Sequence, residues 1–136
     1  MDNQKLDKIL KLFADKIEGS LGNWHFVIKD VQFVCLSDAL HNRMRIISPI
    51  KEHAGMTKEE YHQCLEANFH SALDIKYAIS GDVIWAAFIH PLQELSVSQV
   101  EDAIQQVYSA VKTFGTTYSS SNLYFPTDQD RKNRMN

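Results

Sequence analysis

Residues 82–115 read DVIWAAFIHPLQELSVSQVEDAIQQVYSAVKTFG, and this stretch decides the fold. Its first part, Val83 to Ile89, is an apolar run of strand length. The segment Ser96-Val97-Ser98-Gln99 is a capping box, the signature of a helix N-terminus. Apolar residues then recur at alternating spacings of three and four as far as Phe114, and Gly115 follows. This pattern predicts a strand followed by a long amphipathic helix that packs on a sheet.

The same periodicities organise the rest of the chain. They predict a helix over residues 6–17, strands over 24–28, 31–36 and 43–50, a helix from Thr57, and a hairpin of 73–79 with 82–89. The order is α-β-β-β-α-β-β-α, which predicts an α+β fold with one antiparallel sheet and helices packed on it. We predict a single domain over residues 1–115 and a C-terminal tail over 116–136, which contains the apolar patch Leu123-Tyr124-Phe125-Pro126.

Composition limits the classes of partner. The net charge of −3 and the sequence pI of about 6.0 argue against a nucleic-acid binder that neutralises phosphates, and against attraction to an anionic membrane. The longest apolar run is far shorter than a bilayer span, and no secretion signal follows Met1. Cys35 and Cys64 are interpreted as buried residues in a reducing cytoplasm. Arg43, Arg45 and Lys51 are interpreted as a small basic strand edge that discourages aggregation, with contact to an anionic partner as the alternative.

The residues that carry chemistry form no recognisable active site. His62, Glu66 and His70 share one face of the second predicted helix, but no second ligand cluster exists elsewhere, so a solvated polar face is the interpretation. Cys64 lies on the apolar stripe of that helix, where a structural cysteine is expected. No glycine-rich phosphate loop occurs among the five glycines. We therefore predict no catalytic residue, no metal site and no cofactor.

The apolar run from Val83 to Ile89 also predicts where its strand lies in the sheet. Val83, Trp85 and Ala87 point to one side and the alternate residues to the other, and both sides are apolar. Such a strand is expected to be central in its sheet and buried on both faces. Because one layer of helices covers a single face, another helix or a second subunit must cover the other.

Short motifs carry a family resemblance that extends from about Asp2 to Phe114. They are Trp24 at the start of the first strand, Leu65-Glu66-Ala67-Asn68 at the end of the second helix, and Ile89-His90-Pro91-Leu92 followed by Leu95-Ser96 before the last helix. With the element order, these motifs make the chain resemble the type III secretion chaperone-like (Tir chaperone-like) fold and, within it, the YbjN-type family of small bacterial proteins.

The resemblance implies a homodimer that binds a protein client and has neither catalytic site nor cofactor. It also implies that the second helix and the neighbouring strand supply the dimer or partner interface, here Tyr61, Leu65, Phe69 and Tyr77. The net charge of −3 is milder than the marked acidity typical of secretion chaperones.

The sequence thus predicts a cytoplasmic, non-enzymatic interaction module, a dimeric chaperone-like or regulatory adaptor that binds a protein segment. An extended peptide would add to a sheet edge or lay apolar side chains in a groove between helix and sheet. The alternative is a small-molecule sensor with an apolar pocket between the last helix and the sheet.

Overall fold

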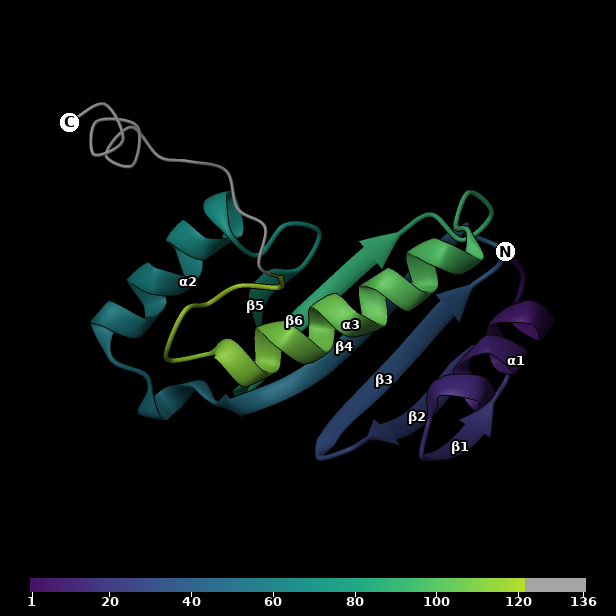
Figure 1. Cartoon of the computed structure of the whole chain (residues 1–136), viewed down its shortest axis with the longest axis horizontal. Coiled ribbons are helices and arrows are strands. Elements are labelled where there is room, and N and C mark those ends of the chain that lie inside the picture. Colours follow the sequence, from purple (N-terminus) through teal and green to yellow (C-terminus); the bar gives the residue numbers. More distant parts are fainter. Residues whose placement is uncertain (122–136) are drawn as a thin grey trace.

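A computed structural model describes residues 1–121 and shows one sheet with three long helices (Figure 1). The helices are α1 (Asn3–Phe13), α2 (Lys58–His70) and α3 (Val97–Thr113), with a short 3-10 helix η1 (His53–Gly55). The strands are β1 (Lys16–Ser20), β2 (Asn23–Ile28), β3 (Val31–Asp38), β4 (Arg43–Glu52), β5 (Lys76–Ser80) and β6 (Val83–His90). They form one antiparallel sheet in the order β1-β2-β3-β4-β6-β5. The predicted α+β fold is confirmed, with one strand more than the periodicity indicated.

The additional strand is β1, which replaces the end of the helix predicted over residues 6–17. The chain is held in this course by Asp15, whose amide donates to the Val27 carbonyl at 2.8 Å and whose carboxylate accepts from the Lys29 amide at 2.6 Å. Gly19 adopts a φ of +118°, and a Cβ there would lie 2.2 Å from the Asn23 carbonyl oxygen. Only glycine fits this approach of β1 to β2, so Gly19 belongs to a hairpin.

The strand β4 lies in the interior of the sheet, hydrogen-bonded to β3 on one side and to β6 on the other. The interpretation of Arg43 and Arg45 as part of a strand edge is therefore wrong. Pro49, which cannot donate to a ladder, is accommodated by a register shift between Pro49 and Lys51.

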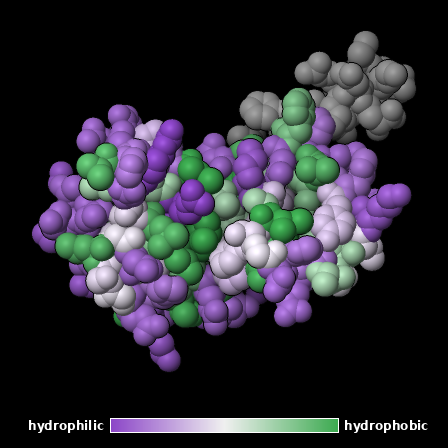
Figure 2. Space-filling model, turned by 180° about the vertical axis from the view of Figure 1, so that it is seen from behind, coloured by the Kyte–Doolittle hydropathy of each residue, from purple (hydrophilic) through white to green (hydrophobic). Residues whose placement is uncertain are grey.

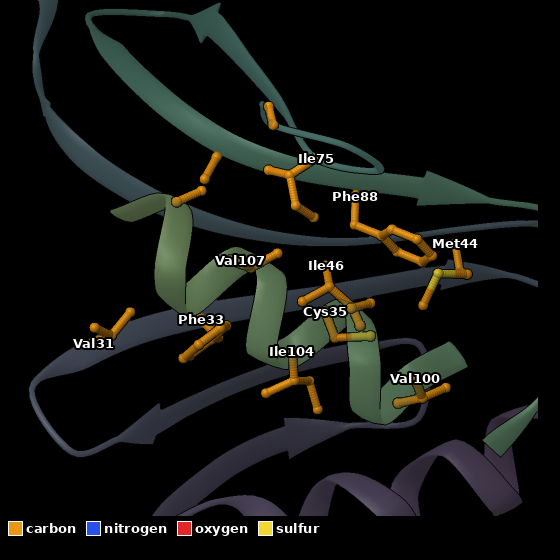
Figure 3. Close-up of a cluster of buried hydrophobic side chains, with 14 of the residues drawn as sticks. Val31, Phe33, Cys35, Met44, Ile46, Ile75, Phe88, Val100, Ile104 and Val107 are labelled. Atoms are coloured by element: carbon orange, nitrogen blue, oxygen red, sulfur yellow. The ribbon is translucent and has the colours of Figure 1, made fainter. Parts of the chain in front are cut away.

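The core lies between the sheet and the layer formed by α1 and α3 (Figure 1). Figure 3 shows α3 side chains, among them Val100 and Val107, directed at sheet residues such as Ile46, and these three side chains are fully buried. Trp24 is also buried, and its Nε1 donates to Asp7 Oδ1 of α1 at 2.9 Å. Trp24 is therefore a core residue that ties α1 to the sheet.

Helix α2 lies beside the sheet, next to the edge strand β5, and not on its face (Figure 1). A capping box of Thr57 and Glu60 begins the helix, at the residue where its start was predicted. Near its end, the Asn68 side chain binds the backbone of β5: Nδ2 donates to the Tyr77 carbonyl at 3.1 Å, and Oδ1 accepts from the Tyr77 amide at 2.8 Å. Asn68, part of the motif that carried the resemblance, therefore closes the β5 edge at this point.

Within residues 1–121, no helix has the length and apolar character needed to cross a membrane. The apolar patch Leu123-Tyr124-Phe125-Pro126 lies outside the described residues.

Candidate functional site

The face of the sheet opposite α1 and α3, here called the open face, lacks a covering layer within the described chain. On β6 the side chains of Ile84, Ala86 and Phe88 are buried under the helices. Those on the other side are half-buried, and Ile89 is 56% exposed. The strand has a neighbour on each side, as predicted, but the expectation that both of its faces are buried is wrong for the single chain.

Strand register extends this apolar surface across the sheet. Val34 pairs with Ile47, and Ile47 with Ala87, so the three side chains form a continuous row. Pro49 pairs with Trp85 in the adjacent row. All five residues are half-buried. Figure 2, which views this side of the molecule, shows hydrophobic surface gathered in its middle with polar surface around it.

A hollow of about 550 Å³ lies on the open face and runs from the edge strand β1 to the centre of the sheet. Its lining residues are Lys16, Ile17, Glu18, His25, Phe26, Val27, Gln32, Phe33, Val34, Pro49 and Trp85. Lys16, Glu18 and His25 line it near the β1 edge, and Val34, Pro49 and Trp85 line it toward the centre of the sheet. The arrangement suits a ligand with apolar side chains and a backbone that remains near polar groups.

A second apolar surface lies on α2. Leu65 is 72% exposed and Phe69 is 83% exposed, while Tyr61, one turn earlier on the same stripe, is half-buried. The Tyr61 hydroxyl donates to the His53 carbonyl at 2.9 Å, which fixes its ring beside the helix. We call Tyr61, Leu65 and Phe69 the α2 surface. The structure therefore brings together three of the four residues predicted for an interface.

The fourth, Tyr77, lies in the core. It is 5% exposed, its hydroxyl donates to the Ala110 carbonyl of α3 at 3.0 Å, and burial raises the pKa of that hydroxyl. Tyr77 cannot contact a partner directly, and its role within the subunit is to join β5 to α3.

The cysteines and histidines occupy positions that suit structural roles. Burial raises the pKa of the Cys64 thiol to about 11 and that of Cys35 to about 12, so both hold their protons at neutral pH. His62 Nε2 lies 2.8 Å from Glu66 Oε1 on exposed helix surface. In the part of the chain that the structure describes, no three His, Cys, Asp or Glu side chains are placed to hold a metal ion.

The space between α3 and the sheet, proposed above for a sensor pocket, is occupied by core side chains (Figure 3). Val100 and Val107 are fully buried there, and Ile104 is 5% exposed. A hollow that touches α3 lies at its rim, where Val111 and Lys112 line it together with residues of β3 and β4.

Known proteins were compared at the levels of sequence and structure. No protein-family model and no curated protein matches the chain. Several solved structures match the chain, and three of them have a TM-score of 0.62 each. One is the HopA1-SchA chaperone–effector complex, at 13% identity over 80% of this chain and 88% of the other. Another is the ExsC-ExsE complex, at 10% identity over 82% and 92%.

The third is the Yersinia pestis type III secretion chaperone SycH in complex with a stable fragment of YscM2, at 15% identity over 82% of this chain and 98% of the other. The chain has the type III secretion chaperone-like fold. The narrower resemblance to YbjN-type proteins stays a prediction, because none of these three structures is of a YbjN-type protein.

Sequence reasoning located the open face only on β6. The residues of β2, β3 and β4 that extend it were missed, although Val27, Val34 and Ile47 are apolar at positions opposite to the core side chains. The pair Ile46-Ile47 indicates this apolar surface, because consecutive residues of a strand point to opposite faces and here both are apolar.

Proposed function

We propose that this protein is a non-enzymatic, chaperone-like module that binds an apolar segment of a client protein on its open face. The observation that carries the proposal is the continuous row of Val34, Ile47 and Ala87 beside a hollow of about 550 Å³. A contiguous apolar patch with a polar rim is the usual mark of a protein interaction site. Two structural neighbours support the proposal, because one is the HopA1-SchA chaperone–effector complex and the other is the secretion chaperone SycH in complex with a stable fragment of YscM2.

The two edges of the sheet favour one direction of approach. At β5 the Asn68 amide occupies the Tyr77 hydrogen-bonding groups, and the Lys76 ammonium group donates to the Asn68 and Leu73 carbonyls. At β1 the strand pairs only with β2, and the hollow begins at its side chains. A client segment that enters from the β1 edge would reach the apolar row with its backbone beside a strand able to pair with it.

We further propose that the α2 surface is the contact between two copies of the chain in the cytoplasm. Leu65 and Phe69 are large apolar side chains on one helical stripe, and a two-fold axis near them would place each stripe against its copy. This contact uses a different element from the open face. A dimer would therefore leave both client surfaces accessible.

The test of client binding is affinity purification of the tagged full chain from its own host, compared with Val34→Glu. Val34 is half-buried on the open face, so a carboxylate there places a charge in the proposed contact without entering the core. Leu40→Glu is the matched control, since Leu40 is 89% exposed in the turn between β3 and β4. We expect a stoichiometric protein with the wild type and the control, and its loss with Val34→Glu.

A client retained equally by Val34→Glu would contradict the assignment to the open face. The sensor alternative would be favoured if no other protein co-purified and denaturation released a small molecule. Its ligand would then have to bind outside the space between α3 and the sheet, which core side chains fill.

A further inference from the structure

The described part of the chain ends at a fixed point beside α2. After α3 the chain turns back, and the Ser120 amide donates to the Ser71 carbonyl at 3.1 Å. The Ser71 hydroxyl in turn donates to the Tyr118 carbonyl at 2.6 Å. The Ser120 hydroxyl donates to Gln106 Oε1 at 3.2 Å, so the same segment is also tied to α3. The chain therefore leaves the body from a defined place, next to the C-terminal end of α2.

A hollow of about 500 Å³ lies at this exit, lined by Ser121 together with residues of α2, β5 and α3. Phe69 and Leu73 supply its apolar wall, while Asp74 and Asp102 supply negative charge. Ser121 and Phe69 thus border one hollow, so the α2 surface begins where the described chain ends.

The next residues match this surface in chemistry and reach. Leu123-Tyr124-Phe125-Pro126 starts two residues beyond Ser121, and four extended residues span about 13 Å. The helix advances about 6 Å between Phe69 and Leu65. We propose that residues 122–136 dock on the α2 surface of their own chain, with Leu123 to Phe125 covering Phe69 and Leu65.

Charge favours the same placement. The segment after Pro126 carries Asp128 and Asp130 followed by Arg131, Lys132 and Arg134, so its basic residues are gathered toward its far end. The α2 helix carries Glu59 and Glu66 beside the apolar stripe. A tail that runs back along α2 brings its basic end toward these carboxylates.

Docking of the tail regulates assembly, and this part of the inference rests on the proposed dimer contact. A tethered segment is present at an effective concentration in the millimolar range, so even a weak contact is populated in the free chain. A second copy must displace the tail to reach Leu65 and Phe69. Removal of the tail therefore strengthens self-association.

Docking is tested by disulfide formation in the full chain carrying His62→Cys and Thr127→Cys, in dilute solution under mild oxidation. His62 is exposed beside the stripe, and neither substitution removes a proposed contact residue. Cys35 and Cys64 are buried, and their raised pKa values keep them protonated at neutral pH, so they compete poorly. We expect a disulfide within one chain, identified by peptide mass spectrometry.

The decisive comparison adds Leu123→Ser and Phe125→Ser to the same cysteine pair. Because tethering is unchanged, only docking differs, and the rate of disulfide formation is expected to fall about tenfold or more. Phe69→Ser gives the reciprocal control and is expected to have the same effect without disturbing the core, since Phe69 is 83% exposed. An unchanged rate in both variants, or a disulfide that joins two chains, overturns the proposal.

Sedimentation of the full chain and of a chain that ends at Ser121 distinguishes docking of the tail on the α2 surface from dimer contact through that surface. Tail-dependent disulfide formation with both chains monomeric supports docking and refutes the dimer contact. Dimers of equal affinity, with or without the tail, refute the regulatory role of the tail.

Discussion

Asn68→Ala tests how much the Asn68 side chain stabilises the edge strand β5. The Asn68 side chain makes both a donated and an accepted hydrogen bond with the backbone of Tyr77, at 3.1 and 2.8 Å. The Tyr77 side chain is buried, and the two hydrogen bonds lie in a partly buried environment. Alanine keeps the helix but leaves the Tyr77 amide and carbonyl on the outer side of β5 without these partners.

The expected cost follows from that geometry. A neutral hydrogen bond contributes about 0.5–1.5 kcal/mol net, and a desolvated backbone group left without a partner costs about 1–3 kcal/mol. Two such bonds, offset by the somewhat better helix propensity of alanine, give a loss of about 2 kcal/mol in the free energy of unfolding. A chain of this size would lose roughly 6–10 °C in melting temperature.

Urea unfolding followed by circular dichroism measures this loss, with Gln63→Ala as the matched control. Gln63 is also an amide on α2, but its bond to Glu59 Oε1 at 2.9 Å is exposed, so its removal should cost at most about 0.5 kcal/mol. If Asn68→Ala is no more destabilising than the control, the two hydrogen bonds to Tyr77 do not stabilise the fold. That result would refute the stabilising role of Asn68 at the β5 edge.

Three further substitutions test other features. Gly19→Ala is expected to lower the free energy of unfolding by about 2 kcal/mol or more, because Gly19 has a φ of +118° and its Cβ would lie 2.2 Å from the Asn23 carbonyl oxygen. Gly55→Ala is the control: a Cβ there would have no atom within 4 Å, so thermal melts should show almost no change. Burial raises the pKa of Cys35 to about 12, so the unfolded chain loses this proton first as the pH rises above about 8.5. The free energy of unfolding should then fall by up to about 1.4 kcal/mol per pH unit, and Cys35→Ala should have a flatter dependence in urea melts between about pH 9 and 11. Phe69→Glu should leave the melting temperature within a few degrees of the wild type, because Phe69 is 83% exposed. It should also abolish any dimer seen by light scattering. A dimer that persists would show that the α2 surface is not the dimer contact.

Elements with one clear period were predictable from sequence, and those shaped by tertiary contacts were not. The capping boxes at Thr57 and Ser96 mark α2 and α3 because they satisfy helix ends locally. The strand β1 was missed because its five residues have one partly buried side chain, Ile17, which also fits the period of the preceding helix. Its conformation depends on contacts of Asp15 with β2 and with the turn that follows it, and no local pattern encodes them.

The four residues predicted for an interface lie in two different places. Tyr61, Leu65 and Phe69 share a helical stripe of α2, whereas Tyr77 is buried in the core. The apolar residues of the helix are divided in the structure, because the described chain buries Cys64 and Ala67 and exposes Leu65 and Phe69. Polar contacts attach this helix to the sheet, because Asn68 binds the β5 backbone and Glu60 forms an ion pair with Lys51 of β4.

The two apolar surfaces require different partners. The open face is broad, extends over several strands and adjoins a strand edge, so it suits an extended segment that supplies side chains at alternate positions. The α2 surface is a single helical stripe of two large exposed residues, which suits a helix from a second copy or a short apolar segment such as the tail. A partner that covers one surface leaves the other exposed. Val34→Glu and Phe69→Glu should therefore have separable effects, the first on client binding and the second on assembly, and a single variant that abolishes both would show that the surfaces act as one site.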